Sequence, residues 1–238
     1  MLKICYICTL EAVSGIKDKR IRIICGHYGS GKSEFSVNYA IKLNESHSKV
    51  ALVDLDVVNP YFRSREQTEE MESLGIKVIS SSLKGNNADL PSISGEVNVP
   101  IIDSSYELVI DLGGDNVGAR VLGRYREDIL NNEYDMLIVL NANRPETQTK
   151  EQSIKYVKDI EATSGLKVSG IINNTHLLKS TTIEDVLRGQ KLAEQVAEEL
   201  NIDVRYTAAI ETLENEIPEN LKSKYFPIGL YLRKDWMS

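Results

Sequence analysis

Short runs of apolar residues alternate along the chain with longer segments in which apolar residues recur at helical spacing. The helical spacing predicts helices over residues 34–43, 64–74, 149–163 and 183–200. The short runs predict buried β-strands at residues 21–25, 49–56, 76–80, 107–111, 136–141, 167–174 and 203–207, with a last edge strand at 228–232. This alternation is typical of an α/β fold in which helices cover both faces of a mostly parallel central sheet.

The length of 238 residues fits one large α/β domain or two small ones. The sequence contains no internal repeat and no stretch that reads as an interdomain linker. We therefore expect one three-layer domain over residues 21–238, preceded by an N-terminal extension over residues 1–20. Residues 81–105 lack periodicity, and we expect this long loop to lie at one edge and to cover a site.

The most informative motif lies between the first predicted strand and the first predicted helix. Residues 26–33 read G-H-Y-G-S-G-K-S, a complete G-x-x-x-x-G-K-[ST] phosphate-binding loop (P-loop). In such a loop, backbone N–H groups point at phosphates, and glycines let the chain curl around them. We expect Lys32 to reach the β- and γ-phosphates and the Ser33 hydroxyl to bind Mg²⁺. The predicted nucleotide-binding residues here are Gly26, His27, Tyr28, Gly29, Ser30, Gly31, Lys32, Ser33 and Glu34.

Carboxylates follow two of the predicted strands, where open α/β sheets bind their ligands. Asp111 ends the run L-V-I-D, a buried position that is costly for a carboxylate unless it is paired or serves a metal. Asp54 and Asp56 end the second strand as D-L-D, and strand alternation points them the same way. The alternative is a pair of solvated turn aspartates. We predict a catalytic set of Lys32, Asp56 and Asp111, and a Mg²⁺ site of Ser33, Asp54 and Asp111.

Charge and hydropathy narrow the class of partner. The formal net charge is −7 and the pI is about 5.2, which argues against nucleic acid or an anionic membrane as the main partner. No apolar run is long enough to cross a bilayer, and the N-terminal residues lack a convincing signal-peptide cleavage site. We therefore expect a cytoplasmic protein with no membrane partner.

Several further residues have two interpretations each. Cys5 and Cys8 form a C-x-x-C, which is either a metal half-site or redox pair, or an incidental part of an N-terminal arm. Cys25 is expected to be a small buried hydrophobe. Two basic clusters either contact a phosphate or an acidic partner, or are solvated: Arg63 with Arg65, and Arg120 with Arg124 and Arg126.

The order of these motifs resembles the MinD/ParA/CobQ–CobB class of P-loop ATPases. The resemblance covers residues from 21 to the C-terminus and rests on the P-loop, the D-x-D, the later D-x-G-G and an asparagine at the end of a later strand. The stretches GHYGSGKSE and DLDVVNPYFRSRE are similar to a group of bacterial ATP-binding proteins within that class. The resemblance implies a P-loop NTPase fold with Mg-ATP as ligand, and a role for Asp56 in placing the hydrolytic water.

The resemblance also implies that an asparagine reads the adenine edge, and this role falls on Asn173 or Asn174. A guanine-specific N-K-x-D is absent, because the stretch reads N-N-T-H, which favours ATP over GTP. One position departs from the class. MinD- and ParA-type members carry a signature lysine directly after the first loop glycine, where this chain has His27. The resemblance implies that this lysine reaches the partner subunit's nucleotide across an ATP-sandwich dimer. A homodimer of this chain would need another positive charge at that place, which Arg63, Arg65 or Arg120 could supply.

Three functions are compatible with these residues. The first is a Mg²⁺-dependent ATPase that acts as a nucleotide-driven switch on a protein partner, with residues 56–66 differing between the ATP and ADP states. The second is an ATP-dependent small-molecule kinase or synthetase of the dethiobiotin/cobyrinate type, with residues 81–105 closing over the acceptor. The third is a non-enzymatic scaffold, which the intact Lys32, Ser33, Asp56 and Asp111 argue against. We predict the first.

Overall fold

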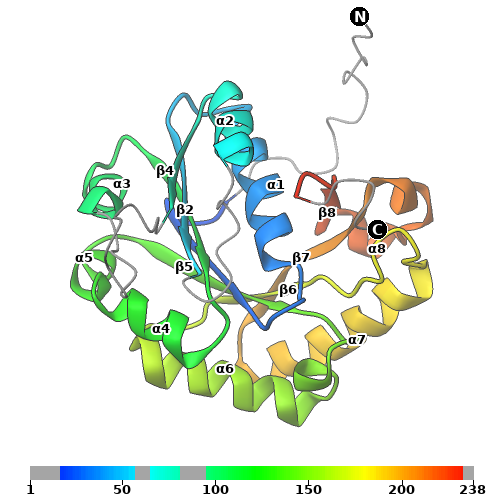
Figure 1. Cartoon of the computed structure of the whole chain (residues 1–238). Coiled ribbons are helices and arrows are strands. Elements are labelled where there is room, and N and C mark those ends of the chain that lie inside the picture. Colours follow the sequence, from blue (N-terminus) through cyan, green and yellow to red (C-terminus); the bar gives the residue numbers. More distant parts are fainter. Residues whose placement is uncertain (1–16, 57–64, 81–94, 233–238) are drawn as a thin grey trace, which may run out of the picture.

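Parallel strands form one sheet through the centre of the molecule (Figure 1). The computed structural model describes residues 17–56, 65–80 and 95–232, and in these ranges eight strands lie in the order β3-β2-β4-β1-β5-β6-β7-β8. Every neighbouring pair is parallel. The strands are β1 (Ile21–Gly26), β2 (Val50–Leu55), β3 (Ile76–Ser80), β4 (Glu107–Leu112), β5 (Tyr134–Leu140), β6 (Gly170–Asn173), β7 (Asp203–Ile210) and β8 (Tyr225–Ile228).

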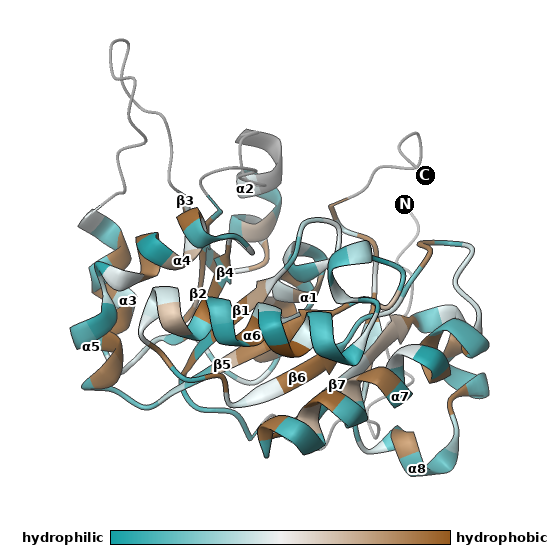
Figure 2. Cartoon of the chain, turned by 90° about the horizontal axis from the view of Figure 1, so that it is seen from below, coloured by the Kyte–Doolittle hydropathy of each residue, from teal (hydrophilic) through white to brown (hydrophobic). Residues whose placement is uncertain are grey.

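Helices cover both faces of the sheet, so the expectation of a three-layer α/β domain is confirmed. In Figure 1, α1 and α2 lie on one face and α4, α5, α6 and α7 on the other. Figure 2 shows apolar strands in the centre and hydrophilic residues on the outer helix turns. The helices are α1 (Lys32–Asn44), α2 (Arg65–Ser73), α3 (Asn98–Ile102), α4 (Asn116–Gly123), α5 (Arg126–Leu130), α6 (Lys150–Ser164), α7 (Ile183–Leu200) and α8 (Glu219–Lys222).

The central strands read as continuous apolar runs because both of their faces are buried. All six residues of β1 are buried. Ile23 and Cys25 face the core beneath α4, α6 and α7, whereas Ile24 faces the core beneath α1. Within the described ranges, no helix combines the length and apolar character that crossing a bilayer requires.

The last strand differs from the prediction. The edge strand β8 spans Tyr225–Ile228, and the predicted run at 228–232 continues without strand structure. The cause lies in α1, whose side chains take the backbone hydrogen bonds of this run. The Asn38 amide donates to the carbonyl of Gly229 at 2.9 Å and accepts from its N–H at 2.8 Å. Glu34 accepts from the N–H of Tyr231 at 2.5 Å.

Helical structure also occurs where the sequence predicted only loop. A 3₁₀-helix (Gly95–Val97) leads directly into α3, within the predicted loop of residues 81–105. Val97 and Ile101 are both buried, four positions apart, so a short helix seals this edge of the core. The predictions for residues 1–16, 57–64 and 81–94, which include Cys5, Cys8 and Arg63, lie outside the described residues.

A buried polar network fixes the amino-terminal end of β1, the strand that leads into the P-loop. The Asp18 carboxylate accepts hydrogen bonds from the hydroxyls of Tyr39 and Tyr206, both at 2.6 Å. Arg205 donates to Asp18 at 2.5 Å and to Asp135 at 3.2 Å. The side chain of Asp18 is only 3% exposed, so the three donors replace its hydration.

We expect Asp18→Ala to lower the free energy of unfolding by about 3 kcal/mol, because two hydroxyls and one guanidinium lose a buried acceptor. Urea unfolding followed by circular dichroism measures this as a lower midpoint at an unchanged slope. Glu133→Ala is the matched control, because its partner Lys19 lies on the surface and Glu133 is 77% exposed. Equal losses in the two variants would show that the Asp18 network does not stabilise the fold.

Candidate functional site

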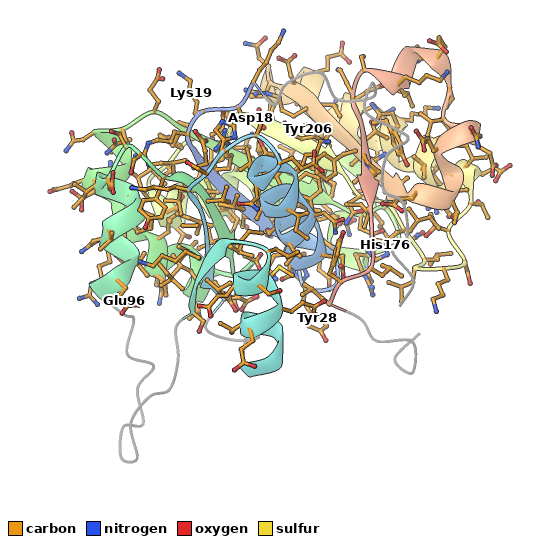
Figure 3. All side chains as sticks on the ribbon, turned by 90° about the horizontal axis from the view of Figure 1, so that it is seen from above. Asp18, Lys19, Tyr28, Glu96, His176 and Tyr206 are labelled. Carbon is orange, nitrogen blue, oxygen red and sulfur yellow. The ribbon has the colours of Figure 1, made fainter. Side chains whose placement is uncertain are left out.

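The predicted site residues meet where the central strands end. Strand pairing places Asp54 of β2 directly beside Asp111 of β4, and the P-loop follows β1 next to them. Figure 3 shows Tyr28 and His176 at this end of the sheet, opposite Asp18 and Tyr206. Ligands in open α/β sheets bind beyond the carboxyl ends of the strands, and the predicted side chains lie together at this end of the sheet.

Two glycines shape the P-loop. Gly29 and Gly31 have φ angles of 76° and 83°, in the left-handed region that side chains rarely adopt. Space is also short at both positions. A Cβ atom at Gly29 would lie 2.7 Å from Cζ of Arg144, and one at Gly31 would lie 2.4 Å from Nδ2 of Asn174. The positive φ angles are therefore what require glycine here, whereas the short contacts show how closely Arg144 and Asn174 approach the loop.

Side chains from neighbouring loops hold the carbonyl groups of the P-loop. Arg144 donates from Nε to the Gly29 carbonyl at 2.8 Å, and Asn174 donates from Nδ2 to the Ser30 carbonyl at 2.9 Å. Within the described residues, the backbone N–H groups of Gly29, Gly31, Lys32 and Ser33 donate no hydrogen bond. A loop whose carbonyls are engaged and whose N–H groups are available is suited to binding an anion.

Lys32 lies between two carboxylates. Its Nζ is 2.8 Å from Oδ2 of Asp56, and both side chains are buried, with 8% and 4% exposed. Burial acts to lower the pKa of Lys32, but the charges of Asp111 and Asp56 outweigh burial, so the net pKa is raised. Lys32 is therefore a firmly protonated cation within the phosphate-binding loop.

Asp54 orients Asp56. Oδ1 of Asp54 accepts the backbone N–H of Asp56 at 3.0 Å, which fixes the turn at the end of β2. A Cβ at Gly113 would lie 3.2 Å from Oδ1 of Asp56, so the glycine turn after β4 packs against this carboxylate. The structure thus brings together Lys32, Asp54, Asp56 and Asp111, all buried, as the sequence proposed for a single site.

The pKa of Asp111 is strongly raised. Burial raises its pKa to about 7, while the charge of Lys32 acts to lower it and the charge of Asp54 adds to the rise. One of its oxygens, Oδ2, is buried without a hydrogen-bond partner among the described residues. An orphaned carboxylate oxygen beside the Ser33 hydroxyl is suited to a water or a cation.

These residues fit Mg²⁺ held together with a phosphate ligand. Within the described residues, no group of three or more His, Cys, Asp or Glu side chains forms a metal cage. Mg²⁺ usually keeps several waters and takes one or two protein oxygens plus substrate phosphates, so a cage is not required. The Ser33 hydroxyl and the orphaned oxygen of Asp111 are the protein groups that would serve, with Asp54 behind them.

The two candidate adenine-reading asparagines have different surroundings. Asn173 is fully buried: its amide donates to the carbonyl of Val186 at 3.0 Å, and its oxygen accepts from the N–H of Thr175 at 3.2 Å. It therefore shapes the turn after β6. Asn174 lies against the P-loop through Ser30. Of the pair, Asn174 is the one in contact with the phosphate-binding loop.

Three other predicted P-loop residues have surroundings that the sequence did not reveal. Glu34 binds the segment after β8 rather than pointing freely into the site. His27 lies 3.6 Å from Glu146, and its ring meets Tyr156 edge to face at 5.7 Å. Tyr28 is 71% exposed.

Sequence reasoning missed the residues that support the loop from behind. Tyr156 of α6 donates to the carbonyl of Gly114 at 3.0 Å, and a Cβ at Gly114 would lie 1.9 Å from the Gly26 carbonyl. Arg144 follows β5 in the stretch L-N-A-N-R-P. The carboxyl-end rule, applied to β5 as it was to β2 and β4, would have identified Arg144. Nothing in the sequence would have identified Tyr156.

Of the arginines proposed to replace the signature lysine, which are Arg63, Arg65 and Arg120, only Arg120 has a described side chain. Arg120 and Arg124 are exposed at α4, and Arg126 is exposed at the start of α5. Arg126 donates from Nε to the carbonyl of Gly165 at 3.2 Å, at the far end of α6. Nothing is described of the Arg65 side chain.

Comparison with known families gives one match. A family model described as CbiA, the CobQ/CobB/MinD/ParA nucleotide binding domain, matches residues 21–220. The comparison with curated proteins gives no match.

Comparison with solved structures finds FtsY proteins among the similar folds. Cell division protein FtsY from Thermotoga maritima has a TM-score of 0.55 at 16% identity, over 93% of this chain and 71% of that one. Chloroplast FtsY from Physcomitrella patens has a TM-score of 0.52 at 16% identity, over 83% of this chain and 63% of that one. The chain therefore spans less than two thirds of the moss protein. At these identities the similarity shows a shared P-loop NTPase fold and nothing finer.

Asp111 makes the stability of the ligand-free protein depend on pH. Its pKa of about 7 lies above the ordinary 3.8, so between these values the unfolded chain has released a proton that the folded chain keeps. Stability therefore falls as the pH rises through this window and levels off above about pH 7. We expect Asp111→Asn to raise the melting temperature relative to the parent protein at about pH 8, and by much less at about pH 4.

Thermal unfolding without nucleotide or Mg²⁺, at both pH values, tests this expectation. Asp203→Asn, which removes an exposed carboxylate of β7, is the control. A melting-temperature difference for Asp111→Asn that does not change with pH would show that Asp111 stays charged throughout.

Proposed function

The chain belongs to the CobQ/CobB/MinD/ParA nucleotide-binding family, and from this premise we propose that it is a Mg²⁺-dependent ATPase that acts as a nucleotide-driven switch on a protein partner. The observation that carries the proposal is the buried ion pair between Lys32 and Asp56 at 2.8 Å. This pair joins the phosphate-binding lysine to the end of β2, and therefore to the segment that follows Asp56.

A nucleotide would compete for Lys32. The lysine of a P-loop binds the β- and γ-phosphates, which carry more negative charge than one carboxylate. Once Lys32 turns to the phosphates, Asp56 loses this ion pair while its backbone N–H is still held by Asp54. A buried carboxylate that loses an ion pair is destabilised, so Asp56 takes up water or moves. Phosphate occupancy is thereby coupled to the position of the chain after residue 56.

The same displacement gives Asp56 a chemical role. A carboxylate released from its ion pair can accept a hydrogen bond from water and orient it for attack on the γ-phosphate. Ser33 and Asp111 would hold Mg²⁺, which supplies charge neutralisation between the β- and γ-phosphates. Hydrolysis then restores the Lys32–Asp56 pair, so both states of the switch are defined by the same two side chains.

Selectivity for ATP is supported by the turn after β6. The stretch from Asn173 to His176 lacks the acidic residue with which N-K-x-D reads guanine. Asn174 presents an amide beside the loop, and amides can pair with the donor–acceptor edge of adenine. We therefore propose ATP rather than GTP as the ligand, and competition of the two nucleotides for one site measures the preference.

We expect Asp56→Asn to keep ATP binding and to slow hydrolysis by about a hundredfold or more, because the group that orients the water is lost while the phosphate contacts remain. Single-turnover hydrolysis and calorimetric binding of a non-hydrolysable ATP analogue separate the two effects. Lys32→Ala is the opposite variant and loses binding itself. Lys42→Ala, on an outer turn of the same helix, is the matched control for Lys32→Ala.

Weakened ATP binding with an intact rate in Asp56→Asn would contradict this role of Asp56. Retained binding in Lys32→Ala would contradict the assignment of the P-loop as the phosphate site. If the parent protein bound ATP but did not hydrolyse it, the protein would be a non-enzymatic nucleotide-binding scaffold.

The switch is expected to alter self-association. Light scattering in the presence of Mg²⁺ and a non-hydrolysable ATP analogue should show a mass about twice the 26.7 kDa of the chain, and ADP should not. The reason is that the γ-phosphate would displace Lys32 from Asp56, while Tyr28, an exposed aromatic side chain on the same loop, is available to a second molecule. An equal mass with ATP analogue, with ADP and without nucleotide would favour the small-molecule kinase or synthetase.

A further inference from the structure

Arg144 is an arginine at the P-loop whose charge is unused. It lies partly buried just after β5 and spends one donor, Nε, on the Gly29 carbonyl at 2.8 Å. Among the described residues, no carboxylate pairs with Arg144, and its two terminal nitrogens donate no hydrogen bond. Three other arginines of the domain are paired with carboxylates: Arg22 with Glu107, Arg188 with Asp185, and Arg205 with Asp18.

The guanidinium lies directly against the loop backbone. A Cβ at Gly29 would be 2.7 Å from Cζ, 2.8 Å from Nε and 3.0 Å from Nη2 of Arg144. The loop N–H groups nearby, those of Gly29, Gly31 and Lys32, donate no hydrogen bond within the described part of the chain. Available N–H groups and an unpaired guanidinium on the same loop point to one anionic ligand for both.

We propose that Arg144 contacts the phosphates of the bound nucleotide from within the same chain and supplies a second positive charge there beside Lys32. This inference rests on the proposed nucleotide-binding function. Arginine is suited to the role because it stays charged and offers several donors in a rigid fork that matches phosphate oxygens.

The position of Arg144 is built in advance. Its N–H donates to the carbonyl of Asn141 at 3.0 Å, and its own carbonyl accepts from the N–H of Thr147 at 3.0 Å. The Thr147 hydroxyl also donates to Asn141 at 3.0 Å, and Pro145 fixes the backbone directly after Arg144. A cation held on such a turn does not lose backbone freedom when the phosphate arrives.

The same turn explains what His27 does. Glu146, two residues after Arg144, lies 3.6 Å from the His27 ring, and Tyr156 packs against that ring. His27 is therefore engaged by its own chain and does not extend towards a second molecule as a signature lysine would. Arg144 therefore donates to the backbone of Gly29 at one end of this segment of the loop, and Glu146 lies close to the His27 side chain at the other end.

Calorimetric affinity for a non-hydrolysable ATP analogue with Mg²⁺ tests the proposal. Arg144→Ala should weaken binding by roughly tenfold to a hundredfold, the range for one charged hydrogen bond. Arg126→Ala is a matched control, because Arg126 makes the same Nε contact with the carbonyl of a glycine at positive φ, Gly165, far from the loop. Its affinity should equal that of the parent protein.

Two further variants separate a phosphate contact from mere support of Gly29. Arg144→Lys keeps the charge and loses the guanidinium fork, whereas Arg144→Gln keeps an N–H donor for the Gly29 carbonyl and loses the charge. The proposal requires that the lysine variant bind the analogue more tightly than the glutamine variant does. It also requires that the affinity of the glutamine variant depend less on salt than the affinity of the parent protein. Equal or tighter binding by the glutamine variant would overturn the proposal and make Arg144 a support of the loop.

The two proposals fail in different ways. If the parent protein bound no ATP analogue, the proposed function would fall, whatever Arg144 does. If the parent protein bound the analogue and Arg144→Ala bound it equally well, only the inference about Arg144 would fall.

Discussion

The ion pair between Lys32 and Asp56 is the interaction on which the site depends. A lysine that is 8% exposed in a strand-end cluster needs a counter-charge, and removing one partner of a buried pair is strongly destabilising. Three buried carboxylates, Asp54, Asp56 and Asp111, lie in the same cluster as this lysine. The surplus of negative charge adds to burial in raising the pKa of Asp111 to about 7, so the cluster is poised to accept a cation, a proton or both.

The rest of the domain holds this cluster in place. β1 is fixed at its amino-terminal end by Asp18 and ends in the P-loop, whose carbonyls are held by Arg144 and Asn174. Glu34 and Asn38, one helical turn apart on α1, bind the backbone after β8. The helix that begins in the P-loop is thereby tied to the last strand of the sheet, and movement of the loop is resisted from both sides.

Much of this could be read from the sequence, because the signals are local. The P-loop motif specifies its own turn and helix start. Continuous apolar runs mark buried parallel strands, and the capping box of Thr182 and Asp185 marks where α7 begins. The contacts of Asn173, Glu34 and Tyr156 were not predictable, because each partner lies at least ten residues away and depends on how the chain folds back. The prediction of a strand at residues 228–232 was wrong for the same reason, because side chains of α1 take the backbone hydrogen bonds that a strand would need.

The two cations at the loop differ in a way that assigns them different tasks. Lys32 is paired with Asp56, so a phosphate that binds Lys32 must break an existing ion pair, and the loss of that pair offsets part of the new attraction. Arg144 has no carboxylate partner in the described part of the chain, so a phosphate that meets it gives up only water. Arg144 and the loop N–H groups are therefore better suited to provide affinity for the phosphates, and Lys32 is better suited to couple phosphate binding to a conformational change. A site that separates these tasks can hold its ligand tightly and still change state when one phosphate leaves.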